Sequence, residues 1–264
     1  ELIARLRESD GWEQSAPDPA SDRQELLPEI ARSIISRNSS PDVPFSLSIN
    51  PYRGCEHGCV YCFARPTHAY LDMSPGLDFE RRIRFKANAA ELLERELCDP
   101  RYRCEPITLG ANTDPYQPAE AELGITRKLL ERCLEHRQPV SIITKSTLIE
   151  RDADLLAELA ALGLCNVFLS VTTLDDELKR RLEPRTASGR ARLRSVAALA
   201  RRGIPVGVLL APIIPALNDT EIERILANAV AAGARKADWI LLRLPHEVAP
   251  LFREWLELQY PERA

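Results

Sequence analysis

The chain carries the stretch FSLSINPYRGCEHGCVYCFARP at residues 45–66. Its first five residues alternate between apolar and polar side chains, as in a β-strand, and lead directly into three cysteines. Cys55, Cys59 and Cys62 follow a C-x3-C-x2-C spacing, with His57 between the first two. Three thiols on one short loop predict either a metal-stapled structural loop or a reactive iron–sulfur site, with a loop of ordinary buried thiols as the third alternative.

Short apolar runs recur after this stretch, and helical patterns separate them. The runs lie at 107–110, 140–144, 166–171, 205–211 and 238–244, and each is predicted to be a buried parallel strand. Helices are predicted at 152–162 and 190–202, each ending at a glycine, and a capping box at Thr220–Glu223 predicts a further helix that stops at Gly233.

Six strands alternating with helices predict an α/β fold, a partial (βα)6 TIM-type barrel that is open along one side. A doubly wound open sheet is the alternative that the same alternation permits. In both folds, ligands gather at the C-terminal ends of the strands.

Two regions differ in composition. Residues 1–44 are polar and interrupted by five prolines, which predicts an N-terminal polar arm with one short helix near residues 25–36. Residues 45–264 carry the regular pattern and are predicted to form one core domain.

Composition narrows the class of protein. The formal net charge of −4 over 264 residues gives no overall basic field that would attract nucleic acid. No apolar run reaches about 18 residues, so no membrane span is predicted. The seven cysteines are unevenly spaced and no apolar leader is present, which favours a reducing cytoplasm. The chain starts at Glu1 and not at methionine, so residues upstream of it stay an open question.

The three-cysteine spacing lacks a neighbouring fourth thiol. A structural zinc site takes four protein ligands, and His57 or His68 is the candidate for the fourth. A 4Fe–4S cluster on three thiolates instead leaves one iron open, where a small molecule with an amine and a carboxylate can chelate it.

The cysteine stretch resembles the signature of the radical S-adenosylmethionine (SAM) superfamily, in which an aromatic residue precedes the last cysteine. Within that superfamily, the chain resembles the spore photoproduct lyases. The motifs that carry this resemblance are NPYRGC and VYCF around the cysteines, TDP at 113–115, TK at 144–145, FLS at 168–170 and EPR at 183–185. The resemblance covers about residues 45–245.

This resemblance implies a 4Fe–4S cluster on Cys55, Cys59 and Cys62, with SAM as the chelator of the fourth iron. It further implies an enzyme that cleaves SAM reductively to methionine and a 5′-deoxyadenosyl radical, which takes hydrogen from a substrate. A small electron donor such as flavodoxin or ferredoxin is the implied reductant.

The strand ends supply the predicted contacts with SAM. The implied cofactor-binding residues are Tyr61, Asn112, Thr113, Asp114, Lys145, Ser170, Thr172 and Arg185, with Arg185 as a two-pronged clamp for a carboxylate. Structural alternatives stay open for several of them: turn and cap residues for Thr113 and Asp114, solvated loop residues for Lys145 and Ser170, and packing for Tyr61.

Other candidates have weaker support. His246 follows the sixth strand and is either a substrate-facing acid–base group or a surface residue that opens the last helix. The four remaining cysteines are interpreted as structural, and these are Cys98, Cys104, Cys133 and Cys165.

The chain also departs from spore photoproduct lyases. Those lyases return hydrogen through a cysteine beside the second strand and a tyrosine after the last cluster cysteine, where this chain has Asn112 and Phe63. Neither side chain donates a weakly held hydrogen atom. The resemblance therefore implies a relative with different downstream chemistry, with an unknown substrate.

A basic segment keeps nucleic acid among the candidate substrates. Residues 179–202 hold nine basic side chains against one acid, and residues 81–86 form a second basic group. Solvated helix faces are the simpler interpretation, because no aromatic residues alternate with the arginines. The alternative to an enzyme is a non-catalytic zinc- or Fe–S-binding protein on a barrel scaffold.

Overall fold

The structure is a computed structural model that describes residues 24–40 and 43–263. Its main sheet has the order β10-β9-β8-β7-β6-β3-β2, in which β2 (Ile35–Arg37) is antiparallel to its neighbour and the other pairs are parallel. The parallel strands are β3 (Leu47–Ile49), β6 (Ile107–Leu109), β7 (Val140–Thr144), β8 (Cys165–Ser170), β9 (Val206–Ile213) and β10 (Lys236–Leu241).

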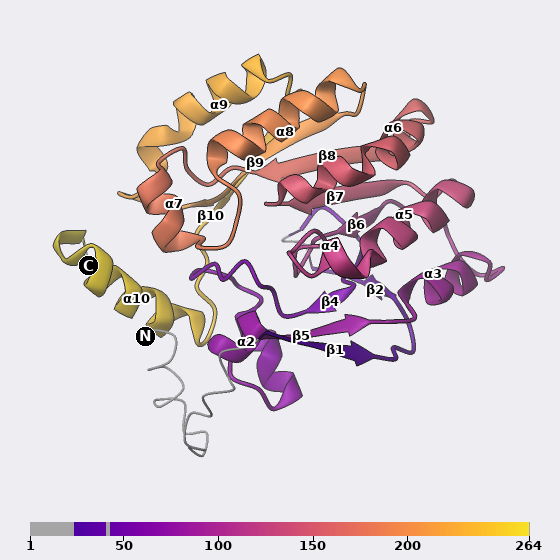
Figure 1. The fold of residues 1–264 in the computed structure, drawn as a ribbon, viewed down its shortest axis with the longest axis horizontal. Coiled ribbons are helices and arrows are strands. Elements are labelled where there is room, and N and C mark those ends of the chain that lie inside the picture. The colour runs from indigo at the N-terminus through magenta and orange to yellow at the C-terminus, as the bar shows by residue number, and fades with distance from the viewer. Residues whose placement is uncertain (1–23, 41–42, 264) are drawn as a thin grey trace.

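Helices lie between successive strands and after the last one. They are α3 (Ala89–Leu97), α4 (Glu120–Leu123), α5 (Ile125–Glu135), α6 (Ala153–Ala161), α7 (Asp176–Leu182), α8 (Gly189–Arg201), α9 (Ile222–Ala231) and α10 (Val248–Gln259). Figure 1 shows α3, α5, α6, α8 and α9 in an arc along one side of the sheet. The strand order never reverses, so the partial (βα)6 barrel is confirmed and the doubly wound alternative is wrong.

The core of the barrel is a layer of aliphatic side chains on adjacent strands. Ile142 pairs in register with Leu109 on one side and Val167 on the other, and all three side chains are fully buried. Apolar residues on both faces of a strand require cover on both faces, which the outer helices and the barrel interior provide.

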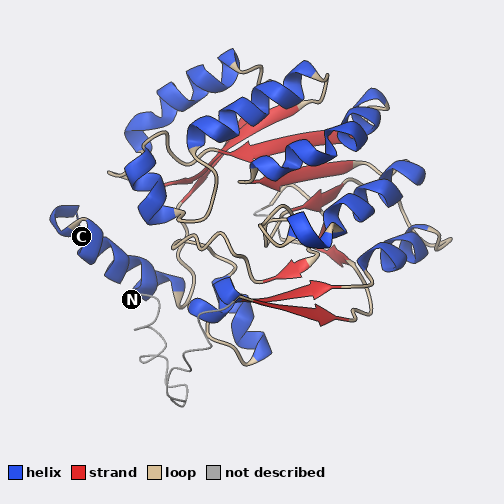
Figure 2. Cartoon of the chain, viewed as in Figure 1, coloured by secondary structure: helices blue, strands red, loops and turns tan. Residues whose placement is uncertain are grey.

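A second, three-stranded sheet in the order β1-β5-β4 lies beside the barrel (Figure 2). It consists of β1 (Glu25–Glu29), β4 (Tyr52–Arg53) and β5 (Arg82–Lys86), and β5 follows the short helix α2 (Leu77–Arg81). The helix predicted near residues 25–36 is therefore wrong. Pro28 explains the error: it disfavours helical geometry at the residue before it, and the segment pairs with β5 instead.

The predicted arm is only partly described, because residues 1–23 and 41–42 lie outside the described residues. Its described part joins both sheets through β1 and β2. The boundary at residue 44 itself stays a prediction.

The predicted capping box at Thr220–Glu223 is also wrong. A 3-10 turn covers Asp219–Glu221, and α9 begins at Ile222 without a side-chain cap. The Glu221 carboxylate accepts instead from the Thr173 hydroxyl and from the Leu174 amide. Because α9 begins at Ile222, Thr220 lies one residue before the N-cap position that a capping box requires.

The last parallel strand differs from the buried strand that was predicted. All six residues of β10 are exposed, including the large side chains of Trp239 and Ile240. The strand is hydrogen-bonded to β9 alone, and the following helix α10 contributes Leu251, Phe252 and Trp255 to a cluster elsewhere. The edge position explains the exposure.

Among the described residues, no helix combines the length and the apolar character that a membrane crossing needs.

Truncation of the central core residue tests the register. Ile142→Ala is expected to lower the free energy of unfolding by about 2–5 kcal/mol, because it leaves a cavity in a fully packed layer. Val230→Ala on α9 is the control, since that side chain is 71% exposed and is expected to change stability by less than about 0.5 kcal/mol. Denaturant unfolding measures both, and equal losses would contradict the assigned core.

Candidate functional site

The cysteine loop, residues 54–64, is held on the barrel by main-chain hydrogen bonds. The Cys55 amide donates to the Phe79 carbonyl at 2.8 Å and the Val60 amide donates to the Leu182 carbonyl at 3.1 Å. Cys55 and Cys59 are buried, Cys62 is partly buried, and none of the three forms a disulfide. The loop therefore presents three free thiols in a protected position.

The three thiols lie close enough to influence one another. Burial raises the pKa of Cys55, and the Asp114, Cys62 and Cys59 anions raise it further by repulsion. Burial likewise raises the pKa of Cys62, and raises that of Cys59 to about 12. Three neighbouring thiolates in an apolar setting need a bound cation to exist, so the donor set fits a metal group.

The two histidines proposed as zinc ligands have other partners. His57 Nδ1 lies 3.4 Å from an Asp114 carboxylate oxygen, and His68 Nε2 lies 3.3 Å from the Arg82 carbonyl oxygen. Within the described part of the chain, no three His, Cys, Asp or Glu side chains are arranged to hold a single ion. An iron–sulfur cluster distributes its thiolates over several irons, so the three cysteines suit a cluster better than one zinc ion.

Asp114, at the end of β6, is a buried organising carboxylate. It accepts from the Thr144 hydroxyl at 2.7 Å, the Lys145 amide at 2.8 Å and the Tyr116 amide at 2.9 Å. Burial opposes ionisation, but His57 and these donors hold the pKa of Asp114 at about 2. The side chain thus ties β6 to the end of β7 and remains an anion.

Tyr61, Lys145 and Thr172 converge from three elements onto Glu183. The Tyr61 hydroxyl donates to Glu183 Oε1, and the Thr172 hydroxyl donates to the same oxygen at 2.7 Å. Lys145 Nζ lies 4.0 Å from that oxygen and 5.9 Å from the centre of the Tyr61 ring. The predicted residues Tyr61, Lys145 and Thr172 are therefore brought together beside Cys59 and Cys62.

Arg192 holds the other side of the Glu183 carboxylate. Its guanidinium donates to Glu183 Oε2 and, at 2.8 Å, to the Ser170 carbonyl oxygen. Both charged side chains are 1% exposed. Burial opposes ionisation of Glu183, but Arg192, Lys145 and the hydroxyl donors hold its pKa at about 2.

Three other residues that were predicted to bind SAM form hydrogen bonds within the protein. The Thr113 hydroxyl donates to the Tyr52 carbonyl at 2.9 Å, and the Asn112 amide nitrogen of the main chain donates to the Asn50 side chain at 3.0 Å. The guanidinium of Arg185 donates to the Glu56 carbonyl and to the Glu80 carboxylate. Arg185 thus supports the cysteine loop, and its role as a carboxylate clamp stays a prediction.

The sequence did not reveal Glu183 and Arg192 as site residues. Glu183 is the first residue of the EPR motif at 183–185, in which only Arg185 was predicted to be a site residue. Arg192 was interpreted as one of the nine basic residues of segment 179–202. The solvated-face interpretation of that segment is wrong for Arg192 and Lys179, which are 1% and 8% exposed.

The remaining candidate residues are not among the side chains that meet at Glu183. His246 is exposed and adopts a positive φ of 47°. Cys133 and Cys165 are buried in α5 and β8, whereas Cys98 and Cys104 are exposed.

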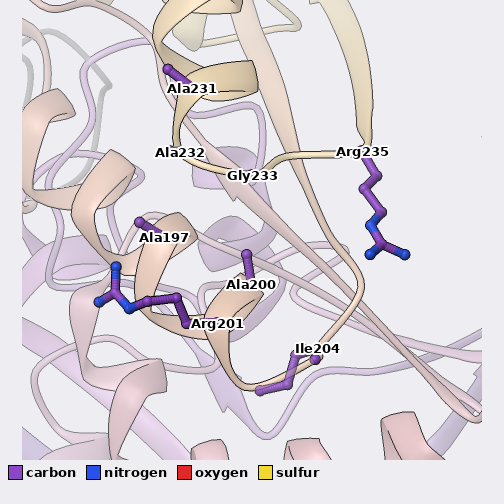
Figure 3. Close-up of a pocket in the computed structure, with 9 residues that line it drawn as sticks. Ala197, Ala200, Arg201, Ile204, Ala231, Ala232, Gly233 and Arg235 are labelled. Atoms are coloured by element: carbon purple, nitrogen blue, oxygen red, sulfur yellow. The ribbon is translucent and has the colours of Figure 1, made fainter.

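A cavity of about 420 Å³ lies at the other end of the barrel (Figure 3). Its lining comes from the C-terminal ends of α8 and α9 and from residues that precede β9 and β10, including Ile204 and Arg235. This cavity is separate from the cysteine loop.

Comparison with known proteins assigns the family. The radical SAM superfamily model matches residues 49–229. The chain therefore belongs to the radical SAM superfamily, a class of enzymes.

Curated proteins of other organisms are similar to most of this chain. An uncharacterised protein of Mycobacterium tuberculosis is 39% identical over 222 residues, which cover 83% of this chain and 65% of the relative. An uncharacterised protein of Methanocaldococcus jannaschii is 27% identical and matches 81% of this chain and 76% of its own. The chain thus spans about two thirds of the length of its mycobacterial relatives.

The fold is similar to that of spore photoproduct lyase. A mutant of that lyase superposes with a TM-score of 0.65 at 18% identity, covering 90% of this chain and 66% of the lyase chain. The lyase complexed with dinucleoside spore photoproduct superposes with a TM-score of 0.62 over the same shares. At this identity the similarity concerns the fold alone.

Substitution of Gly58 tests the close contact of the cysteine loop with Arg185. An added Cβ at Gly58, where φ is +66°, would overlap the Arg185 guanidinium and would lie 2.7 Å from the Glu80 carboxylate. Gly58→Ala is therefore expected to destabilise the fold by clearly more than the ~1–2 kcal/mol of left-handed strain alone.

Gly124→Ala is the matched control, because Gly124 has a φ of +61° but no atom within 4 Å of the added Cβ. Denaturant unfolding compares the two variants. Equal losses would show that the contact with Arg185 is loose.

Removal of Arg192 tests the buried ion pair. Arg192→Met is expected to cost about 3–5 kcal/mol, because it leaves the Glu183 charge buried and unpaired. Adding Glu183→Gln to that variant is expected to restore part of the stability, which a double-mutant cycle measures.

Acid titration provides a second measurement on the same pair. The folded pKa of Glu183, about 2, lies below its ordinary value of 4.5, so its stabilisation is present above pH 4.5 and is lost as the pH falls toward 2. The stability difference between wild type and Glu183→Gln is therefore expected to shrink over this range. A constant difference would contradict the lowered pKa.

Proposed function

We propose that the chain is a radical SAM enzyme that cleaves SAM reductively and abstracts hydrogen from a substrate. The single observation that carries this proposal is the loop of three free thiols beside the convergence of Tyr61, Lys145 and Glu183. Cys55, Cys59 and Cys62 would hold a 4Fe–4S cluster. When bound, such a cluster would supply the electron for the cleavage of SAM into methionine and a 5′-deoxyadenosyl radical.

The residues of the chain bind and orient the cofactor. Lys145 offers a cation for the methionyl carboxylate, and its 17% exposed side chain is anchored by Glu183 and by the Ala211 carbonyl at 3.5 Å. The hydroxyl of Tyr61 is fixed by Glu183, which holds the ring in one orientation for contact with adenine. Such preorganised groups raise the rate because little reorganisation is left for the reaction.

Asp114 and Thr172 contribute indirectly. The carboxylate of Asp114 is occupied by donors from β7 and the turn after β6, so it shapes the pocket wall more than it offers a free ligand. The Thr172 hydroxyl is similarly committed to Glu183. Ser170 and Asn112 remain proposed contacts at the ends of β8 and β6.

The substrate is proposed to differ from that of spore photoproduct lyase, which is solved in complex with a dinucleoside photoproduct. Phe63 is 55% exposed and, like Asn112, has no transferable hydrogen of the kind a thiol or phenol holds. Nucleic acid remains a candidate substrate, although Arg192 and Lys179 are withdrawn from the basic segment by burial. Flavodoxin or ferredoxin in the cytoplasm is the proposed source of electrons.

Anaerobic reconstitution with iron and sulfide tests the proposal. The loaded protein, reduced with dithionite in the presence of SAM, is expected to release 5′-deoxyadenosine, measured by mass spectrometry. Cys55→Ala, Cys59→Ala and Cys62→Ala are each expected to lose bound iron and this product.

Cys98→Ala is the matched thiol control, because Cys98 is exposed at the end of α3, and it is expected to retain both. A colourless protein with stoichiometric zinc would support the non-catalytic binder instead. Repeating the assay with added DNA, RNA or cell extract identifies the substrate class by increased product.

A further inference from the structure

Three charged side chains, Arg65, Glu80 and Arg185, form a bridge against the back of the cysteine loop. The Glu80 carboxylate receives Arg65 on one oxygen and Arg185 on the other. We propose that this Arg65–Glu80–Arg185 bridge raises the reduction potential of the iron–sulfur cluster through its net positive charge, besides holding the loop. This inference rests on the proposed function.

Arg65 is the central support of the loop. Its guanidinium donates through both Nε and one Nη to the Cys59 carbonyl, each at 3.0 Å, and through the other Nη to the Pro75 and Gly76 carbonyls at 3.1 Å. The side chain is 1% exposed and lies 2.5 Å from Glu80. A cation with this many donors in a buried site keeps one position and one distance from the neighbouring cysteines.

Arg185 and Glu80 lie against the middle of the loop. Arg185 donates to the carbonyl of Glu56, which follows Cys55, and its main-chain amide donates to the His57 carbonyl at 3.3 Å. The absence of a side chain at Gly58 lets both charged groups approach the backbone between Cys55 and Cys59. The bridge thus touches the main chain of the loop at Glu56, His57 and Cys59.

The charges of the bridge do not cancel. Two guanidinium cations and one carboxylate leave one net positive charge next to the three cysteines. Reduction adds one electron to the cluster, and a nearby positive charge stabilises the reduced form more than the oxidised form. The 1% exposed Arg65 contributes more to this effect than the 48% exposed Arg185, whose charge water screens. Removal of an arginine is therefore expected to lower the potential, whereas removal of the Glu80 charge is expected to raise it.

This opposition of sign separates an electrostatic role from a purely structural one. A merely structural bridge weakens when any member is removed, so its variants would lose cluster or stability in the same direction. The substitutions leave the other charged residues around the loop in place, among them Glu56 within the loop and Asp114, Lys145, Glu183 and Arg192 beside it.

The test is a redox titration of the reconstituted protein, followed by electron paramagnetic resonance of the reduced cluster. At a fixed ambient potential, Arg65→Gln is expected to decrease the ratio of reduced to oxidised cluster about tenfold, which is ~59 mV for one electron. Glu80→Gln keeps the shape and an acceptor oxygen, and is expected to change the ratio by a similar factor in the opposite direction.

Two control variants test whether the charge of the bridge sets the potential. Arg65→Lys retains the charge and is expected to keep the wild-type potential despite the loss of hydrogen bonds. Arg101→Gln, at a side chain that is 90% exposed, is expected to leave the potential unchanged. If Arg65→Gln does not take up iron, Arg185→Gln replaces it, because that side chain is 48% exposed, and a decrease in the same ratio is expected.

Shifts of the same sign in the arginine and Glu80 variants, or no shift, would overturn this inference while leaving the proposed function intact. Failure of the wild-type protein to load a cluster would instead overturn the proposed function.

Discussion

The structure depends on holding three thiols of one loop at the mouth of the barrel without a fourth cysteine to close the set. Buried charged side chains hold much of this arrangement in place. Glu183 and Arg192 anchor Tyr61 and the ends of β7 and β8, while Glu80 joins Arg65 to Arg185 behind the loop. Buried ion pairs of this kind add little net stability, but removal of one partner is costly because it leaves the other charge buried and unpaired.

The two sets of charges act on different neighbours. The Glu183 set lies on the side of the strand ends, where a nucleotide cofactor would bind, and it orients an aromatic ring and an ammonium group. The Glu80 set is bonded to main-chain carbonyls and leaves the side chains of the loop free. This arrangement separates the charges beside the strand ends from the charges that support the cysteine loop.

Much of the fold was predictable because its signals are local. Apolar runs of strand length, helices that end at Gly163 and Gly203, and the cysteine spacing each specify structure within a few residues. One error arose where a tertiary partner decides the structure: β1 is extended because it pairs with β5. For the same reason, Arg192 was unrecognisable among nine basic residues, since only the folded chain brings it onto Glu183.

The free edge of β10 has a consequence for how the protein behaves in concentrated solution. A strand that is paired on one side only offers its remaining main-chain donors and acceptors as a template for other extended chains, and Trp239, Ile240 and Leu241 add apolar surface to it. Lys236 and Asp238 interrupt this surface with charge. Charged side chains at such positions are a means by which natural edge strands oppose edge-to-edge pairing.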